Sequence, residues 1–272
     1  MTRTILVPSS IVREAEDKRE ATRKLGYVAR AAAVFRIDRL LVFPDPAGEG
    51  RWGESFVETV LAYAATPPDL RKEAWDRRAE LEYAGILPPL RLPPQTGSGS
   101  TSSGSSRQGI VTEVGSDGRV RVNCGLQHPI SLVVPDGMTV EEGERVTVSV
   151  ASRDPVRARL IEEPPPGFSV GRSDLSAALD SEDAGLRIAA SRHGDPLTTG
   201  RLPGLVERAT DDGLTVAFGA PERGLPAILG VEAGDPGAGF DLWLNTVPNQ
   251  GSEVVRTEEA VFATLAALSL TE

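Results

Sequence analysis

The side chains best suited to chemistry lie in a polar segment near the end of the chain, directly after a short apolar run at residues 240–244. Residues 245–252 read Asn-Thr-Val-Pro-Asn-Gln-Gly-Ser, and Arg256 and Glu258 follow closely. Backbone groups, amides and hydroxyls in such a segment can bind the edges of an adenine ring, while apolar walls hold its faces. An arginine can stabilise negative charge or hold a phosphate, and a glutamate can serve as a base. The segment therefore indicates a ligand pocket with a charged pair beside it.

Each candidate side chain also has a purely structural interpretation. Glu258 falls in the first turn of an expected helix, where a negative charge is favourable whatever its chemistry. His193 is an ordinary loop histidine in the simpler interpretation and a general base in the other. Cys124 is most simply a small apolar residue of a strand. Because His128, His193 and Cys124 are scattered in the sequence, we expect no metal site.

Composition is that of a globular protein with an acidic balance. The 272 residues are 40% hydrophobic and 25% charged, and no apolar run approaches the roughly 20 residues that a membrane helix needs. We therefore expect a cytoplasmic protein without a membrane partner. The formal net charge of −10 disfavours nucleic acid at first sight, but the basic residues are almost all arginine, the better phosphate ligand. Acidic excess with few lysines also suggests adaptation to high salt as a hypothesis.

The elements that must position these residues begin with a βαβ pattern. A short strand at 4–7, a helix at 13–35 and an apolar strand at 39–43 predict a parallel sheet that is buried on both faces. Two more helices are expected at 54–64 and 68–83.

The next segment has the composition of a linker. Residues 96–106 are an uninterrupted run of glycine, serine and threonine, which predicts a flexible linker. Beyond it, evenly spaced short strands predict a small antiparallel barrel resembling oligonucleotide-binding folds, with strands at 110–114, 119–123, 130–134, 145–150 and 158–161. Such a fold does not by itself establish a ligand, and a structural or dimer-packing insert is the alternative.

After the barrel the α/β pattern resumes, so the barrel interrupts one larger domain. A helix is expected at 174–179, and further strands are expected at 185–190, 205–207, 214–218 and 240–244. Three of these strands end in small and polar residues, near Ser191, Gly219 and Asn245. Ligands of α/β proteins bind outside the carboxyl ends of the strands, so these three exits should form one pocket.

Several segments together resemble one protein family. Residues 244–252 and 256–260 look like the knotted C-terminal segment of the SPOUT-class RNA methyltransferases. The resemblance is to the archaeal and eukaryotic branch that carries an OB-like insertion, and it covers nearly the whole chain. It extends to the first βαβ unit, the second helical segment and the barrel, through residues 27–31, 37–43, 67–92, 107–111 and 122–125.

The resemblance implies a discontinuous α/β domain with a parallel sheet and a C-terminal trefoil knot, formed by residues 1–95 and 164–272. The OB-like insertion would comprise 107–163 after the linker at 96–106. The implied protein is a homodimer that binds S-adenosylmethionine and methylates RNA, with rRNA favoured over tRNA and uridine N3 as a weakly transferred target. Carried over by motif, the cofactor-binding residues are Ser191, Gly219, Ala220, Glu222, Leu244, Asn245, Thr246, Val247, Pro248, Gln250, Gly251 and Ser252. The chain departs from the family where residues 220–223 replace an expected second glycine.

The charged candidates complete the hypothesis. Arg256 and Glu258 are the catalytic candidates, and Arg30 and Arg256 are the candidate RNA contacts. Arg30 has the alternative of an ordinary solvated helix face. We expect Arg256→Ala to abolish methyl transfer while leaving cofactor binding nearly intact. The alternative function is a non-catalytic RNA-binding or ribosome-assembly factor that keeps the fold.

Overall fold

The computed structural model describes residues 1–45, 47, 51–53, 55–90, 95–96 and 105–270. Its contacts divide the chain into two units. The sheet unit comprises Met1–Ala65, Arg78–Pro88 and Phe168–Glu272. The barrel unit comprises Thr66–Arg77 and Pro89–Gly167. In the sequence, the barrel unit thus interrupts the sheet unit twice.

A six-stranded sheet in which every neighbouring pair is parallel forms the centre of the sheet unit. In chain order the strands are β1 (Arg3–Pro8), β2 (Arg39–Phe43), β9 (Ser169–Arg172), β10 (Leu186–Pro196), β11 (Leu214–Phe218) and β12 (Leu242–Asn245). Their spatial order is β12-β10-β11-β1-β2-β9. Every residue of β11 is buried, as expected of an interior strand of a parallel sheet that is covered on both faces.

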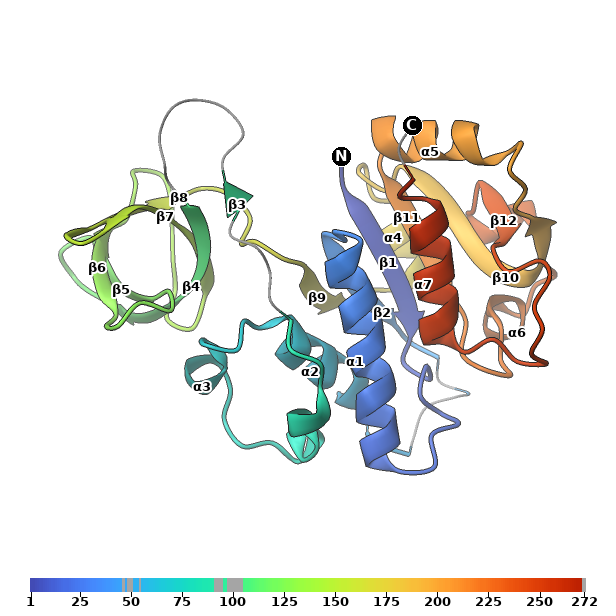
Figure 1. Cartoon of the computed structure of the whole chain (residues 1–272), viewed down its shortest axis with the longest axis horizontal. Coiled ribbons are helices and arrows are strands. Elements are labelled where there is room, and N and C mark those ends of the chain that lie inside the picture. The colour runs from blue at the N-terminus through green and yellow to red at the C-terminus, as the bar shows by residue number, and fades with distance from the viewer. Residues whose placement is uncertain (46, 48–50, 54, 91–94, 97–104, 271–272) are drawn as a thin grey trace. The chain divides into compact units, whose positions relative to one another are not determined.

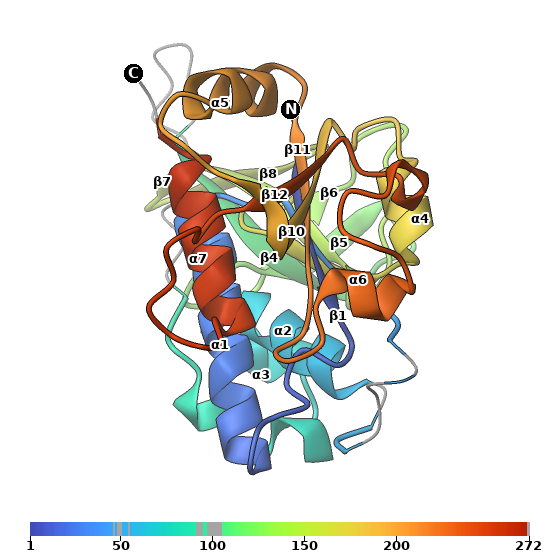
Figure 2. The ribbon, with the colours of Figure 1, turned by 90° about the vertical axis from the view of Figure 1, so that its right-hand side faces the viewer.

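Helices cover both faces of this sheet. They are α1 (Lys18–Val34), α2 (Phe56–Ala65), α4 (Leu175–Leu179), α5 (Leu202–Asp211), α6 (Leu225–Leu229) and α7 (Thr257–Ala267), with short 3-10 turns at Ala79–Leu81, Ala84–Ile86 and Pro236–Ala238. Figure 2 shows α1 and α7 on one side of the sheet and α4 and α6 on the other. The rings of Phe35 and Phe262 meet edge to face at 5.9 Å, which joins the C-terminal end of α1 to the middle of α7.

The barrel unit holds the short helix α3 (Arg71–Ala74) and an antiparallel sheet. Its strands are β3 (Gln95–Thr96), β4 (Ser105–Val114), β5 (Arg119–Asn123), β6 (Ile130–Val133), β7 (Arg145–Arg153) and β8 (Val156–Ile161). The order β6-β5-β4-β7-β8, with β6 beside β8, makes a nearly closed barrel, which is visible in Figure 1. Cys124 belongs to the barrel core, and burial raises the pKa of its thiol. The interpretation of Cys124 as a small apolar residue is confirmed by its burial, but it lies directly after β5 rather than within a strand.

The expected α/β class, the parallel sheet and the antiparallel barrel insertion are confirmed. Three local predictions were wrong. The first helix begins at Lys18 rather than residue 13, because the Asp17 side chain accepts a hydrogen bond from the Glu20 amide and caps it. Residues 205–207 belong to helix α5, whose buried residues Leu205 and Ala209 are one turn apart. Residues 68–83 form only α3 and one 3-10 turn instead of a continuous helix.

Two further predictions concern the linker and the absence of a membrane helix. Most of the stretch 96–106 lies outside the described residues, apart from Thr96 in β3 and Ser105 and Ser106 in β4. Of the helices that the structure describes, none has the combined length and apolar character that a membrane crossing requires.

Candidate active site

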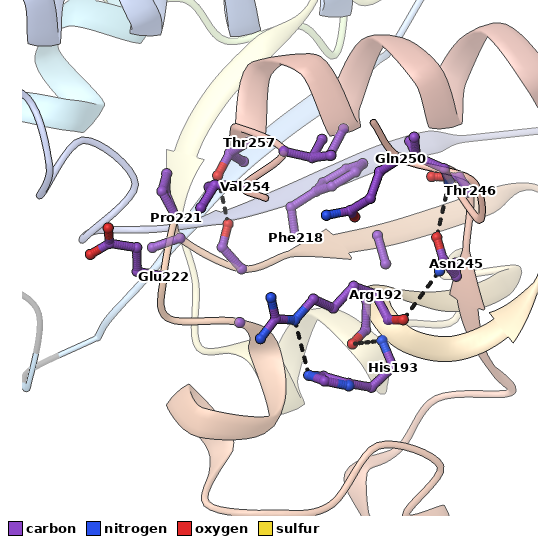
Figure 3. A pocket seen from close by; sticks show the side chains of 18 of the residues that line it. Arg192, His193, Phe218, Pro221, Glu222, Asn245, Thr246, Gln250, Val254 and Thr257 are labelled. Carbon is purple, nitrogen blue, oxygen red and sulfur yellow. Dashed lines mark hydrogen bonds between the residues drawn. The ribbon is translucent and has the colours of Figure 1, made fainter. Parts of the chain in front are cut away.

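Three loops meet where the adjacent strands β12, β10 and β11 end. Because these parallel strands are neighbours, the loops that leave their carboxyl ends lie at one edge of the sheet. Together with the start of α7 they enclose a pocket of about 290 Å³, drawn in Figure 3. This volume is near the lower end of the roughly 300–1,000 Å³ usual for small-molecule sites. The expectation that the three exits form one pocket is confirmed.

The first of the three loops, residues 191–194, is a detour within β10 itself, where the strand leaves its pairing with β12. Ala190 and Asp195 are both paired with Leu244, so the four residues 191–194 leave the ladder and return to it. On the return Gly194 passes so close to β12 that an added Cβ would lie 2.6 Å from the Leu244 nitrogen and the Trp243 carbonyl carbon. Only glycine fits this passage without a backbone shift, so Gly194 lets the chain cross here.

The detour is held in place by hydrogen bonds, shown in Figure 3. The Asn245 side-chain amide donates to the Arg192 carbonyl at 3.1 Å, while its oxygen accepts from the Val247 amide at 3.0 Å. The His193 amide donates to the Ser191 hydroxyl, and Arg192 Nε donates to His193 Nε2, each at 3.1–3.2 Å. One amide side chain therefore connects the loops after β10 and β12.

The loop after β11 has an unusual backbone. Ala220 and Arg223 exchange hydrogen bonds between their amides and carbonyls at 3.0 and 3.1 Å, which closes a tight turn. Within this turn Glu222 has φ of +59°, a left-handed conformation that costs a side-chain-bearing residue about 1–2 kcal/mol. This is the loop in which the resemblance led us to expect a second glycine. The chain adopts a glycine-like conformation there with a glutamate.

Two threonine hydroxyls fasten α7 to the loops. Thr257 Oγ1 donates to the Gly219 carbonyl at 2.8 Å, and the hydroxyls of Thr246 and Thr264 are hydrogen-bonded at 2.8 Å. The Gln250 amide donates to the carbonyls of Ser252 and Glu253, which shapes the remainder of the third loop. The helix, both loops and the pocket wall are therefore one hydrogen-bonded structure.

Apolar surfaces and a few charges share the pocket lining. The apolar side includes Phe218, which is buried, together with Val247, Val254, Pro221 and Ala260. The charged lining residues are Arg192, Glu222 and Glu253, and His193 also lines the pocket. Such a lining suits a ligand with a flat apolar ring and with hydroxyls or an ammonium group for the carboxylates to bind. Arg192 can bind a negative charge on a second molecule beside that ligand.

The structure brings most of the predicted cofactor residues to this pocket. Eight of them line it, namely Ser191, Gly219, Ala220, Glu222, Asn245, Thr246, Val247 and Gln250. The other four lie outside the lining formed by the described residues: Leu244 is fully buried within β12, and Pro248, Gly251 and Ser252 are exposed. Contact of any of these residues with a cofactor stays a prediction.

Arg256 and Arg30 are both exposed, and neither belongs to the lining that the described residues form. Arg256 precedes α7, and its amide donates to Glu259 Oε2 at 2.9 Å. Arg192 lines the pocket instead, and it was not among the predicted site residues. Its position at the exit of a strand was the available signal.

Glu258, the other catalytic candidate, is not among the described residues that line the pocket. It is 8% exposed, and its electrostatic neighbours are Lys24 of α1, Glu14 and Glu259. Burial raises the pKa of the Glu258 carboxyl, against the opposing effects of its own backbone amide and of Lys24. Burial alone would lower the pKa of Lys24, but ion pairs with Glu14 at 2.6 Å and Glu20 at 3.3 Å outweigh it and raise that pKa.

The raised pKa of Glu258 gives a testable pH dependence. A carboxyl whose pKa is higher in the folded state adds stability that is complete below its unfolded pKa, 4.5, and is lost as the pH rises through the folded value. Glu258→Gln keeps the neutral form at every pH. We therefore expect the difference in unfolding free energy between Glu258→Gln and the native protein to move in favour of the variant from pH 4.5 to 7.5, as measured by urea denaturation. A difference that does not change with pH would contradict this.

No cluster of three or more histidine, cysteine, aspartate or glutamate side chains that could hold a metal occurs within the described ranges.

The sheet unit has an α/β fold with a pocket at the carboxyl ends of neighbouring parallel strands, the place where α/β proteins commonly bind ligands. The family described as "Putative RNA methyltransferase" matches residues 2–268, and the chain belongs to this family. It is 69% identical to an uncharacterised protein of Halobacterium salinarum over the full length of both. It is 29% identical to the 28S rRNA (uridine-N(3))-methyltransferase of Homo sapiens, over 98% of this chain and 77% of the human protein. The enzyme of that name from Drosophila melanogaster is 27% identical over 98% and 61%.

Proposed function

We propose that the protein is an S-adenosylmethionine-dependent RNA methyltransferase that acts on a ribosomal RNA base, with uridine N3 as the preferred candidate atom. The observation that carries this proposal is the pocket formed by three adjacent strand exits in a chain of the RNA methyltransferase family. The uridine N3 target rests on the name of the human relative.

The lining fits S-adenosylmethionine in its chemistry. Phe218, Val247 and Val254 offer apolar surface for the adenine ring, and Glu222 and Glu253 offer carboxylates for hydroxyls and an ammonium group. The Thr257 and Asn245 side chains are already hydrogen-bonded to loop backbone, so the wall is formed in advance of binding. When bound, the cofactor supplies an activated methyl group.

This chain's own residues would then align the base and exclude water from it. A uridine must lose its N3 proton to become nucleophilic, and His193, which lines the pocket, would accept that proton. Arg192, also in the lining, would stabilise the resulting negative charge on the base. Arg256, exposed at the start of α7, is better suited to hold an RNA phosphate. Arg30, exposed on α1, is a second candidate for RNA contact.

The same proposal includes the knot, the oligomeric state and the division into domains. The C-terminal segment would form the trefoil knot of SPOUT proteins, and the active molecule would be a homodimer. The methyltransferase domain would comprise residues 1–95 and 164–272, and the barrel insertion at 107–163 would bind RNA. A non-catalytic RNA-binding or ribosome-assembly factor is the second candidate. The pre-formed Asn245 and Thr257 contacts favour the first.

Cofactor binding separates the two candidates. We expect the native protein to bind S-adenosylmethionine in isothermal titration calorimetry. Asn245→Ala removes the two hydrogen bonds that join the loops, so affinity should fall about tenfold. Asn249→Ala changes an exposed residue of the same loop and should bind like the native protein. No binding by the native protein would leave only the non-catalytic candidate.

Mass-spectrometric mapping of rRNA and tRNA after deletion of the gene identifies the target. We expect one methylated rRNA base to be lost. Unchanged modification of both RNA classes would overturn the enzymatic proposal.

A further inference from the structure

An ion pair between half-buried Arg223 and buried Asp45 anchors the β11 exit loop on the side away from the pocket lining. Residues 219–222 and 224 line the pocket, whereas Arg223 does not belong to the lining. Its guanidinium binds Asp45 instead, through Nε at 3.0 Å and 3.3 Å from the two carboxylate oxygens and through a terminal nitrogen at 3.2 Å. One residue of the loop is thus anchored away from the pocket while its neighbours form the pocket wall.

The anchor point is rigid. Asp45 follows β2 and is 1% exposed, and the Ser10 hydroxyl donates to it at 2.6 Å. The Asp45 amide in turn donates to the Ser9 hydroxyl at 2.9 Å. Asp45 is therefore fixed by the segments that follow β1 and β2, the two strands beyond β11 in the sheet. A buried carboxylate with this set of partners holds a planar arginine far more firmly than a solvated one.

The loop needs such an anchor because its conformation is costly. Glu222 is held at positive φ by the turn between Ala220 and Arg223, and glutamate has no intrinsic preference for that region. The residue after Glu222 is the one that binds Asp45. The ion pair therefore acts at the point where the strained backbone would otherwise relax.

We propose that Arg223 is a positioning residue: its ion pair with Asp45 keeps the loop 219–224 in the conformation that lines the cofactor pocket. The role of the pocket rests on the proposed function. If the loop is in the competent conformation for only a fraction of the time, apparent affinity falls by that fraction. Loss of the Arg223–Asp45 ion pair, called the clamp below, should therefore weaken cofactor binding without any change in the residues that touch the cofactor.

The test combines hydrogen exchange with calorimetry on the full chain. In Asp45→Asn, amide exchange in the peptide covering 219–225 should speed up about tenfold or more, and S-adenosylmethionine should bind about tenfold more weakly. Arg223→Lys keeps the charge but not the bidentate contact and should give an intermediate loss of affinity. Ser10→Ala is the milder variant should either of these fail to fold.

The chain offers a matched control at the other end of the strands. Arg187 at the start of β10 binds Asp241, just before β12, in a similar bidentate arrangement at 2.8 and 3.2 Å. Asp241→Asn should lower the melting temperature but leave cofactor affinity within about twofold. A purely structural role for Asp45 would make the two variants behave alike.

The outcomes are distinguishable. Unchanged loop exchange in both Asp45→Asn and Arg223→Lys would overturn the positioning role, whatever the ligand. Faster exchange with unchanged affinity would overturn it as well. Absence of cofactor binding by the native protein would instead overturn the proposed function, while the exchange experiment would still decide whether the clamp exists.

Discussion

The variant Gly194→Ala is expected to lose about 3 kcal/mol of stability and to lose cofactor binding. Its added Cβ would lie 2.6–2.7 Å from backbone atoms of Trp243 and Leu244, which no side-chain rotation can relieve. Overpacking costs roughly 1–3 kcal/mol, and a clash with backbone belongs at the upper end. Since residues 191–194 line or border the pocket, any backbone shift that relieves the clash also deforms the site.

Calorimetric melting measures this effect, at about 2–4 °C for each kcal/mol in a chain of this size. Gly200→Ala is the matched control, because nothing lies within 4 Å of a Cβ added there. It should change stability by no more than about 0.5 kcal/mol. If Gly194→Ala had the same melting temperature as the native protein and still bound cofactor, the close passage of β10 over β12 would be disproved.

The variant Arg192→Ala should lower kcat for RNA methylation by about 100-fold while leaving cofactor affinity nearly unchanged. Removal of one group that stabilises developing charge typically costs 10²–10³ in rate, and Arg192 is the arginine of the pocket lining. The substrate is rRNA from a strain that lacks the gene, with methyl-labelled S-adenosylmethionine.

Arg256→Ala is the informative comparison. An exposed phosphate contact should raise KM and weaken the dependence of binding on salt, with kcat less affected. Should Arg256→Ala abolish methyl transfer and Arg192→Ala leave kcat intact, the charge-stabilising role would return to Arg256, as the sequence alone suggested.

The sequence predicted the elements whose signals are local. The strands at 39–43 and 214–218 were correct because each is a nearly continuous apolar run with clear turn residues at one end or both. The run at 205–207 was too short to tell strand from helix, and only tertiary packing of Leu205 and Ala209 decides it. Prediction of the pocket followed from the parallel order of three strands, each with a polar exit.

The remaining features depend on partners that are distant in sequence. Glu258 is buried beside Lys24 and Glu14, and nothing near Glu258 in the sequence indicates that neighbourhood. The Arg223 anchor lies at Asp45, on the far side of the inserted barrel unit in the sequence. The register shift between Ala190 and Asp195, which presents Arg192 to the pocket, exists only once β12 is paired with β10.

The place of β1 within the sheet has a consequence for how the protein is made. Its residues Arg3 to Leu6 pair with Leu214 to Ala217, so a ribosome must add more than two hundred residues before this ladder can close. Until then the edge of β1 that pairs with β11 has no partner. Non-local pairing of this kind slows folding and favours misassembly. The barrel, with contacts that are local in sequence, can fold meanwhile. The pocket, which needs β10, β11 and β12 together, is completed only after nearly all of the polypeptide has emerged.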